Sequence, residues 1–247
     1  MEGISRKEFD KVENTDFATV PGRSLRPRDS ATLLLLDRHD GDVRVLMGKR
    51  HARHVFMAGK YVFPGGRTDP ADSRIVVAAG LEPAEEQKLR AGAGQITAAR
   101  ARAIALSAIR ETYEEAGLLI GEPGDFVAGR ADWQGFAEHK VRPSLAGLRL
   151  VARAITPPGR VRRFDARFFA TWRSTVAVEL PDGGPTDELE CCAWLTFEEA
   201  MQQDLPSITK TVLEVVRERL RDDPDLKAPA PVPFYRMLNN RFRRDMI

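Results

Sequence analysis

Residues 108–118 read Ala-Ile-Arg-Glu-Thr-Tyr-Glu-Glu-Ala-Gly-Leu, a stretch with the pattern of a helix that has two different faces. An α-helix turns by about 100° per residue. Ala105, Ile109, Tyr113 and Ala116 therefore fall on one side, at spacings of three and four residues. Such an apolar stripe predicts a helix that packs against a hydrophobic core.

Three carboxylates, from Glu111, Glu114 and Glu115, share the opposite side of this helix, and Arg110 lies beside them. Like charges that are neighbours on a helix destabilise it. A hard divalent cation removes this repulsion and prefers oxygen ligands. An exposed acidic helix face is the alternative interpretation of these residues on their own. Gly117 stands where a left-handed C-terminal cap is expected.

A second informative stretch, residues 61–72, reads Tyr-Val-Phe-Pro-Gly-Gly-Arg-Thr-Asp-Pro-Ala-Asp. The first three residues predict a short strand, and Pro-Gly-Gly ends it. The absence of side chains at Gly65 and Gly66 lets the backbone turn tightly and brings a carbonyl close to a ligand. An ordinary turn is the alternative interpretation of the same tripeptide.

Together the two stretches resemble the signature of the Nudix hydrolase family, in which a glycine, a glutamate and an Arg-Glu-x-x-Glu-Glu-x-Gly segment follow one another at fixed spacing. Here Gly66 is followed by five residues and Asp72, and residues 110–118 form the second half. Asp72 replaces the usual glutamate, and Thr112 occupies a usually apolar position. Residues 73–109 stand where seven residues are usual, an insertion of about 30 residues. This split signature is similar to that of the coenzyme A diphosphatase branch.

The resemblance implies an α+β protein with a Nudix-like α/β/α sandwich, a mixed sheet and an insertion inside the signature. It also implies a hydrolase that uses Mg²⁺ or Mn²⁺ to cleave the diphosphate linkage of a nucleoside diphosphate derivative. Carried over residue by residue, the implied metal ligands are the carbonyl of Gly65 and the carboxylates of Glu111, Glu114 and Glu115.

Further roles follow from the same resemblance. Arg110 is expected to pair with a neighbouring carboxylate and fix its orientation. The acid before the last strand, Glu188 with Glu190 in reserve, is expected to act as ligand or base. Arg163 and Arg167 are expected to contact phosphate. Arg50 belongs to a basic cluster with residues 51, 53 and 54, for which phosphate contact and a solvated loop are equally good interpretations.

The implied substrate is coenzyme A or an acyl-CoA, with ADP-ribose, a dinucleotide or a nucleotide sugar as alternatives. A module of the same fold that senses a nucleotide without cleaving it is an alternative of another class. The presence of all three helix carboxylates favours the enzyme. We expect residues 1–28 to form an arm, 29–222 a Nudix domain with the insertion at 73–98, and 223–247 a tail.

The insertion must emerge beside the predicted metal site. We therefore expect it to shape the substrate pocket or to act as a lid, with Arg90, Arg100 and Arg102 supplying positive charge. A decoration that packs elsewhere is the alternative.

The composition of the chain is that of an ordinary globular protein. It has 247 residues, of which 30% are charged and 43% hydrophobic, and a net charge of +2. This charge is too small to imply nucleic-acid binding by itself. No window approaches the roughly 20 apolar residues of a membrane span. Without an apolar leader or a disulfide framework, we expect a cytoplasmic protein, and Cys191 and Cys192 are expected in the core. The C-terminal tail is basic, with Arg236, Arg241, Arg243 and Arg244. Exposure to solvent and contact with a second subunit, as in a homodimer, are both open for it.

Overall fold

The computed structural model of the chain describes residues 5, 25–51, 53, 57–91 and 95–247. Most of the expected arm at residues 1–28 therefore lies outside the described residues, as do His54 and residues 92–94 of the insertion. No helix in the described part of the chain combines the length and the apolar character needed to cross a bilayer.

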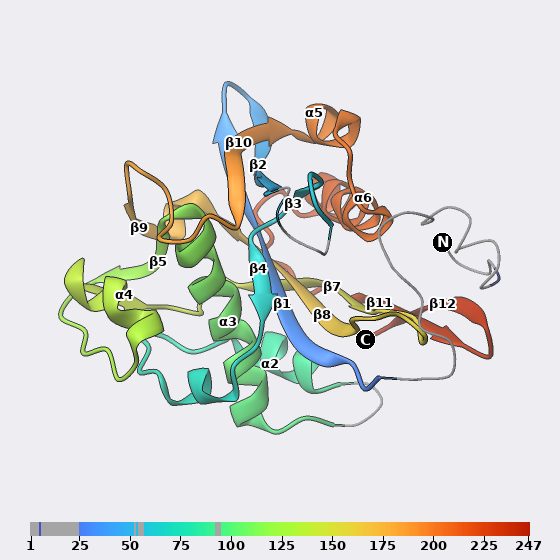
Figure 1. Cartoon of the computed structure of the whole chain (residues 1–247), viewed down its shortest axis with the longest axis horizontal. Coiled ribbons are helices and arrows are strands. Elements are labelled where there is room, and N and C mark those ends of the chain that lie inside the picture. The colour runs from blue at the N-terminus through green and yellow to red at the C-terminus, as the bar shows by residue number, and fades with distance from the viewer. Residues whose placement is uncertain (1–4, 6–24, 52, 54–56, 92–94) are drawn as a thin grey trace.

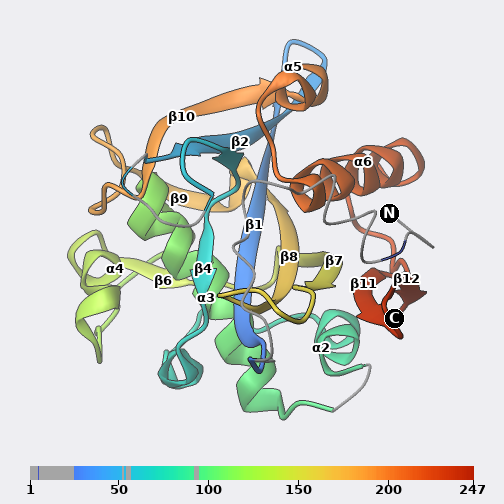
Figure 2. The same cartoon turned by 45° about the vertical axis from the view of Figure 1, so that its right-hand side comes forward.

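Within the described residues, a mixed sheet of nine strands forms the centre of the molecule (Figures 1 and 2). Its main path has the order β10-β2-β1-β8-β7-β11-β12, while β3 pairs with β2 and β4 pairs with β1. The strands are β1 Arg28–His39, β2 Asp42–Arg50, β3 Tyr61–Val62, β4 Gly65–Arg67, β7 Arg149–Ile155, β8 Phe164–Trp172, β10 Leu189–Thr196, β11 Pro233–Leu238 and β12 Arg241–Met246. A smaller sheet has the order β6-β5-β9, formed by Val141–Pro143, Leu118–Pro123 and Val176–Glu179.

Helices cover both faces of the main sheet (Figure 2). On one face lie η1 Pro70–Arg74, α2 Pro83–Arg90 and α3 Ala98–Ala116; on the other lie α5 Phe197–Gln202 and α6 Ser207–Asp222. The short helices η2 Ala131–Trp133, α4 Gln134–Glu138 and η3 Arg173–Thr175 border the small sheet. Residues 33–36 of β1 are fully buried, because alternate leucines enter the two hydrophobic clusters on either side of the sheet. The expected α/β/α sandwich with a mixed sheet is confirmed.

The described residues of the insertion pack against the base of α3 and the sheet, rather than against a pocket. Leu89 of α2 enters the core with 2% of its surface exposed. The carboxylate of Glu85 accepts a hydrogen bond from the backbone N–H of Leu150 at 2.7 Å. Arg102 donates to the carbonyls of Ser73 and Ile75. The alternative interpretation, a decoration packed elsewhere, therefore describes these residues better than a lid.

The stretch expected to be a tail, residues 223–247, contains a β-hairpin that extends the main sheet. β11 pairs parallel with β7 through Phe234–Arg153 and Tyr235–Ala154, and β12 pairs antiparallel with β11. The prolines that suggested a tail precede or begin the hairpin, and only Pro233 lies within it, at the first position of a strand, where the missing N–H is tolerated. The hairpin buries Phe234, Tyr235 and Phe242, which explains its attachment to the sheet.

The prediction that the two cysteines lie in the core is wrong. Cys191 and Cys192 are exposed free thiols. The register between β10 and β2 shifts between Glu190 and Ala193, and Cys191 has a positive φ of 50°. This bulge in an edge strand interrupts the alternation that would bury one of the two side chains.

Candidate active site

Helix α3 has well-defined ends that place its acidic face beside β4. The hydroxyl of Thr97 accepts the backbone N–H of Arg100, and Gly117 ends the helix with a φ of 71°. The carbonyl of Glu114 accepts two hydrogen bonds from Thr186, one from its N–H and one from its hydroxyl. These bonds hold the loop before β10 against the end of α3, and so bring Glu188 to the acidic face.

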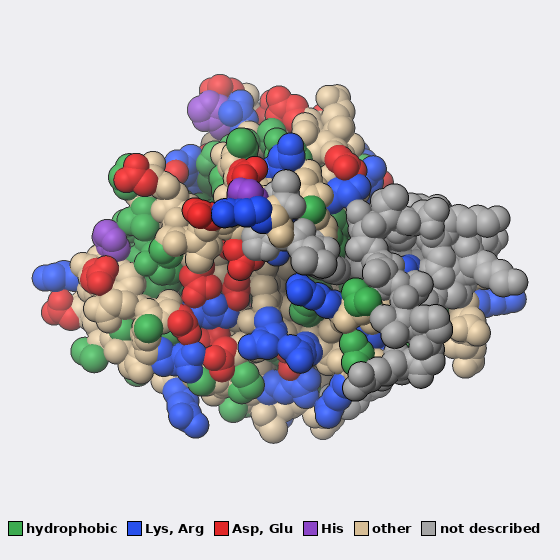
Figure 3. Space-filling model, viewed as in Figure 1, with side chains coloured by type: hydrophobic (Ala, Val, Ile, Leu, Met, Phe, Trp, Pro, Cys, Tyr) green, Lys and Arg blue, Asp and Glu red, His purple; other side chains and the backbone are tan. Residues whose placement is uncertain are grey.

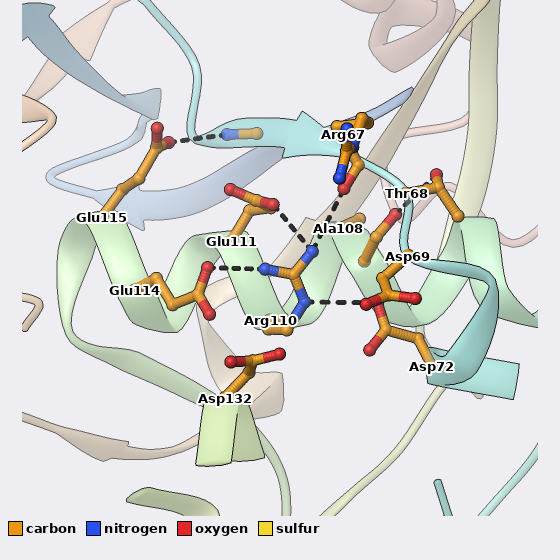
Figure 4. A network of polar contacts seen from close by, with 12 residues as sticks. Arg67, Thr68, Asp69, Asp72, Ala108, Arg110, Glu111, Glu114, Glu115 and Asp132 are labelled. Atoms are coloured by element: carbon orange, nitrogen blue, oxygen red, sulfur yellow. Dashed lines mark hydrogen bonds and ion pairs between the residues drawn. The ribbon is translucent and has the colours of Figure 1, made fainter. Parts of the chain in front are cut away.

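Arg110 binds the carboxylates on both sides of the split signature (Figure 4). Its guanidinium nitrogens lie 2.7 Å from Glu111, 2.6 Å from Glu114 and 3.2 Å from Asp72. It also donates to the carbonyl of Arg67 at 3.2 Å. Because a guanidinium is planar and rigid, these contacts fix the directions of three carboxylates at once. The expected pairing of Arg110 with neighbouring carboxylates is therefore present, while its positioning role stays a prediction.

Asp72 is completely buried, and one of its carboxylate oxygens pairs with Nε of Arg110. Its second oxygen accepts a hydrogen bond from Nε1 of Trp133 at 3.0 Å. Both oxygens are thus occupied by donors from the protein. We conclude that Asp72, in the position of the usual glutamate, orients Arg110 in this conformation.

Glu115 has an incompletely satisfied carboxylate. Oε2 accepts the backbone N–H of Gly65 at 2.8 Å. Oε1 is buried without a hydrogen-bond partner among the described residues, and the nearest cation, Nη1 of Arg50, lies 3.9 Å away. Burial, together with the nearby charge of Glu111, raises the pKa of Glu115 to about 8.

The neighbouring carboxylates respond to the same environment. Burial, with repulsion from Glu111, raises the pKa of Glu114 to about 7 despite the contact with Arg110. Burial also raises the pKa of Glu111. The three carboxylates at the C-terminal half of α3 additionally face the negative end of the helix dipole. The site is therefore short of positive charge.

Gly66 makes the close approach of β4 and α3 possible. A Cβ at this position would overlap the carboxylate of Glu111. Glu111 can thus lie directly against the strand backbone.

Arg50 and Glu188 complete the rim of the acidic cluster. Nη2 of Arg50 lies 3.2 Å from Oε2 of Glu188. Glu190 instead contacts His51 at 2.9 Å, on the side of a second cavity. The structure therefore brings Glu188 to the carboxylates of α3 and directs Glu190 away.

A cavity of about 580 Å³ opens beside these residues. In the space-filling view, acidic side chains border basic ones near the middle of this face (Figure 3). The cavity's charged lining comprises Arg50, Arg67, Asp69, Arg110, Glu111, Glu114, Asp132, Arg160 and Glu188. Its apolar lining includes Met57, Val62, Phe63, Ala154, Ile155, Pro157, Phe164, Ala166, Phe168, Ile208 and Phe242, with Tyr235 among them.

Two of the arginines predicted to contact substrate lie outside this lining. Arg167, with 1% of its side chain exposed, forms ion pairs with Asp29 at 2.7 Å and Asp165 at 3.2 Å. Asp165 also binds Arg153 at 2.8 Å, so Asp29, Arg167, Asp165 and Arg153 form a largely buried chain of charges, whose outer end at Asp29 is also bound by Arg100. The prediction for Arg167 is wrong, because its side chain points to the face of the sheet that carries α3.

Arg163 donates to the carbonyls of Thr156 and Leu25 and does not line the cavity. Arg160, from the turn between β7 and β8, does line it. The cluster of arginines after Pro157-Pro158-Gly159 was visible in the sequence, but which of them faces the cavity depends on the turn.

The fit of a divalent cation can be judged from the protein atoms. No group of three or more His, Cys, Asp or Glu side chains among the described residues is arranged to hold a metal ion. Arg110 engages Glu111 and Glu114 in this conformation. Yet the unpartnered Oε1 of Glu115, the raised pKa values of Glu114 and Glu115, and the all-oxygen donor set suit a hard cation. The chemistry of these residues therefore fits a hard divalent cation, while Arg110 holds two of the carboxylates in this conformation.

Comparison with solved structures identifies the architecture. The chain is similar to a NUDIX hydrolase from Alicyclobacillus acidocaldarius, with 23% identity over 82% of this chain and 99% of that chain, and a TM-score of 0.61. The chain has the Nudix fold. Two more distant similarities are to the NUDIX domain of Shewanella oneidensis NrtR complexed with ADP ribose and to a C. elegans Ap4A hydrolase. The first is 12% identical, covers 86% of this chain and 98% of that chain, and has a TM-score of 0.46. The second is 13% identical, covers 79% and 98%, and has a TM-score of 0.42. No family profile matches the sequence, and no curated protein matches it.

Proposed function

We propose that this Nudix-fold chain hydrolyses the diphosphate linkage of a nucleoside diphosphate derivative with the help of Mg²⁺ or Mn²⁺. The observation that carries the proposal is the acidic cluster on α3. Glu111 and Glu114 line a cavity large enough for a small-molecule substrate, and the next residue, Glu115, has a buried carboxylate oxygen without a hydrogen-bond partner among the described residues. Two or more carboxylates with raised pKa values in one cleft are typical of a functional site.

The proposed metal-binding residues are Gly65, through its carbonyl, with Glu111, Glu114 and Glu115. When bound, the cation would neutralise charge on the diphosphate and lower the pKa of a coordinated water. The chain's own residues do the remaining work. Arg110 holds Glu111 and Glu114 in place, and Arg50 holds Glu188.

Glu188 is the proposed base, because it lies at the cavity and is not engaged by Arg110. Its ion pair with Arg50 keeps the carboxylate directed toward the cluster. Arg50 and Arg160 are the proposed phosphate contacts, because both line the cavity beside the carboxylates.

Coenzyme A or an acyl-CoA is the proposed substrate, supported by the resemblance of the split signature and by the apolar part of the cavity lining. The alternatives are ADP-ribose, a dinucleotide and a nucleotide sugar. A panel of these compounds, each incubated with Mg²⁺, with Mn²⁺ and with a chelator, tests the proposal by mass analysis of the products. Binding without cleavage of any compound would instead support a nucleotide-sensing module.

A further inference from the structure

One side of the cavity is a straight row of residues that crosses five neighbouring strands. Arg67 of β4 is opposite Ser30 of β1, and Ser30 is opposite Ala166 of β8. Ala166 is opposite Ala154 of β7, which is opposite Tyr235 of β11. All five residues line the cavity. The cavity therefore runs across the strands, from the acidic cluster to the C-terminal hairpin.

Small side chains in the middle of this row form the floor of the cavity, and larger side chains on either side form its walls. Ser30, Ala166 and Ala154 have small side chains, whereas Phe168 and Phe164 stand two residues to either side of Ala166 on β8. Residues two apart on a strand lie on the same face. Ile208, in the first turn of α6, closes the space from above. We call this space the strand-crossing groove, defined by Ser30, Ala154, Phe164, Ala166, Phe168, Ile208 and Tyr235.

The dimensions of the groove follow from the sheet. Strands are about 4.8 Å apart, so the four steps from β4 to β11 span about 19 Å. Figure 2 shows these strands side by side in this order. The far end is formed by Tyr235 and Phe242 of the hairpin. The groove is therefore long and narrow, and its floor offers the methyl groups of Ala154 and Ala166 beside the hydroxyl of Ser30.

We propose that the strand-crossing groove binds a slender, extended arm that is attached to the diphosphate of the substrate and lays methyl and methylene groups over Ala154 and Ala166. The inference rests on the proposed function, since the arm is the second substituent of the diphosphate that the acidic cluster would hold. A compact sugar or a planar base is short compared with the span of about 19 Å and would leave the far end at Tyr235 and Phe242 empty, which disfavours both as occupants.

The test fills the floor of the groove without altering the acidic cluster. Ala166→Leu and Ala154→Leu place a larger side chain on the floor, and Ala99→Leu, on the exposed first turn of α3, is the matched control. Hydrolysis of coenzyme A, which carries a long arm, is compared with hydrolysis of ADP-ribose, which carries a compact substituent. Thermal unfolding of each variant confirms that it is folded, and Ala166→Val replaces any variant that is not.

We expect the ratio of kcat/KM for coenzyme A to kcat/KM for ADP-ribose to fall about tenfold or more in both groove variants, chiefly through KM. The Ala99→Leu protein should keep the wild-type ratio. An unchanged ratio in the groove variants, or a wild-type protein that cleaves ADP-ribose and not coenzyme A, would overturn the inference.

A binding measurement tests whether the groove binds the arm independently of whether the protein hydrolyses a diphosphate. Calorimetry with 4′-phosphopantetheine, which carries the arm without a nucleoside, should detect binding to wild type that weakens about tenfold in Ala166→Leu. If this result is obtained while no diphosphate is cleaved with either metal, binding of the arm in the groove is supported and the proposed hydrolysis is refuted. Equal binding by wild type and Ala166→Leu, or none by wild type, overturns the groove.

Discussion

The backbone N–H of Gly65 donates to one oxygen of Glu115 at 2.8 Å, while the other oxygen of the same carboxylate is buried without a hydrogen-bond partner in the described part of the chain. One contact thus joins the two halves of the split signature across the insertion. The unpartnered oxygen explains why the pKa of Glu115 rises to about 8, since burial disfavours its charged form.

The metal-free protein should lose stability as the pH rises from about 4.5 to about 8. The carboxyl of Glu115 has an ordinary pKa of 4.5, and its pKa in the folded protein is about 8. Between these values the folded state retains a proton that the unfolded state has released, so the free energy of unfolding decreases with pH. Denaturant titrations in chelator across this range measure the slope. Glu115→Gln should flatten it, and a wild-type protein with no slope would contradict the assigned pKa.

Replacing Glu114 or Glu115 by glutamine should lower turnover at least about 10²-fold, because each change removes a negative ligand that would act on the reacting phosphate. The folded state should survive, since the substitution relieves repulsion among carboxylates. Steady-state kinetics and calorimetry with Mn²⁺ measure the two effects. Glu198→Gln, on an exposed side chain of α5, is the control. Unchanged turnover and Mn²⁺ affinity in both variants would refute the metal assignment.

Gly66→Ala should reduce turnover roughly 10²-fold, because the new Cβ would displace the carboxylate of Glu111 from β4. Gly129→Ala adds the same methyl group where no atom lies within 4 Å, and it should behave as wild type. Kinetics on the best substrate of the panel compare the two variants. Equal activity would mean that the position of Glu111 against the strand is unimportant.

Asp72→Ala should lower the free energy of unfolding by about 3–5 kcal/mol, since it leaves part of the buried Arg110 charge and the Trp133 N–H unpaired. The surface pair between Asp204 and Lys60 gives a control. Asp204→Ala should cost less than about 1 kcal/mol. Denaturant unfolding distinguishes the two, and a small effect of Asp72→Ala would show that Asp72 does not support the arginine.

Leu89→Ala should destabilise the protein by about 2–5 kcal/mol through loss of buried volume. It should leave KM unchanged, because none of the described residues of the insertion lines the cavity. Gln87→Ala, two residues earlier and on the exposed face of α2, should change neither quantity. A raised KM in Leu89→Ala at full folding would restore a substrate role for the insertion.

The sequence was a good guide wherever the physics is local. The apolar stripe predicted the core-facing side of α3, and Gly117 predicted its C-terminal end. Glu188 lies at the cavity beside the carboxylates of α3, because the loop that carries it is tied to the end of α3 by Thr186. Its role as ligand or base stays a prediction.

The sequence was a poor guide where tertiary context decides. The pairing register between β1 and β8 determines which face of the sheet carries the side chain of Arg167. A single sequence does not show this register. A bulge exposes both cysteines, although their apolar surroundings predicted burial. The prolines around residues 224–233 suggested a tail, yet pairing of β11 with β7 depends on contacts made 80 or so residues earlier in the chain.

The buried chain of charges formed by Asp29, Arg167, Asp165 and Arg153 has a consequence for how this sequence can vary. Removing Asp165 would leave Arg153 as an uncompensated buried charge, and removing Asp29 would leave Arg167 with one carboxylate in place of two. Exchanging buried charges together for apolar residues of similar volume is, by contrast, often neutral or favourable. Intermediate states would therefore be selected against. Across evolutionary time these four positions should be inherited as a block, so that substitutions at Asp29 in β1 are accompanied by substitutions more than a hundred residues away in β7 and β8.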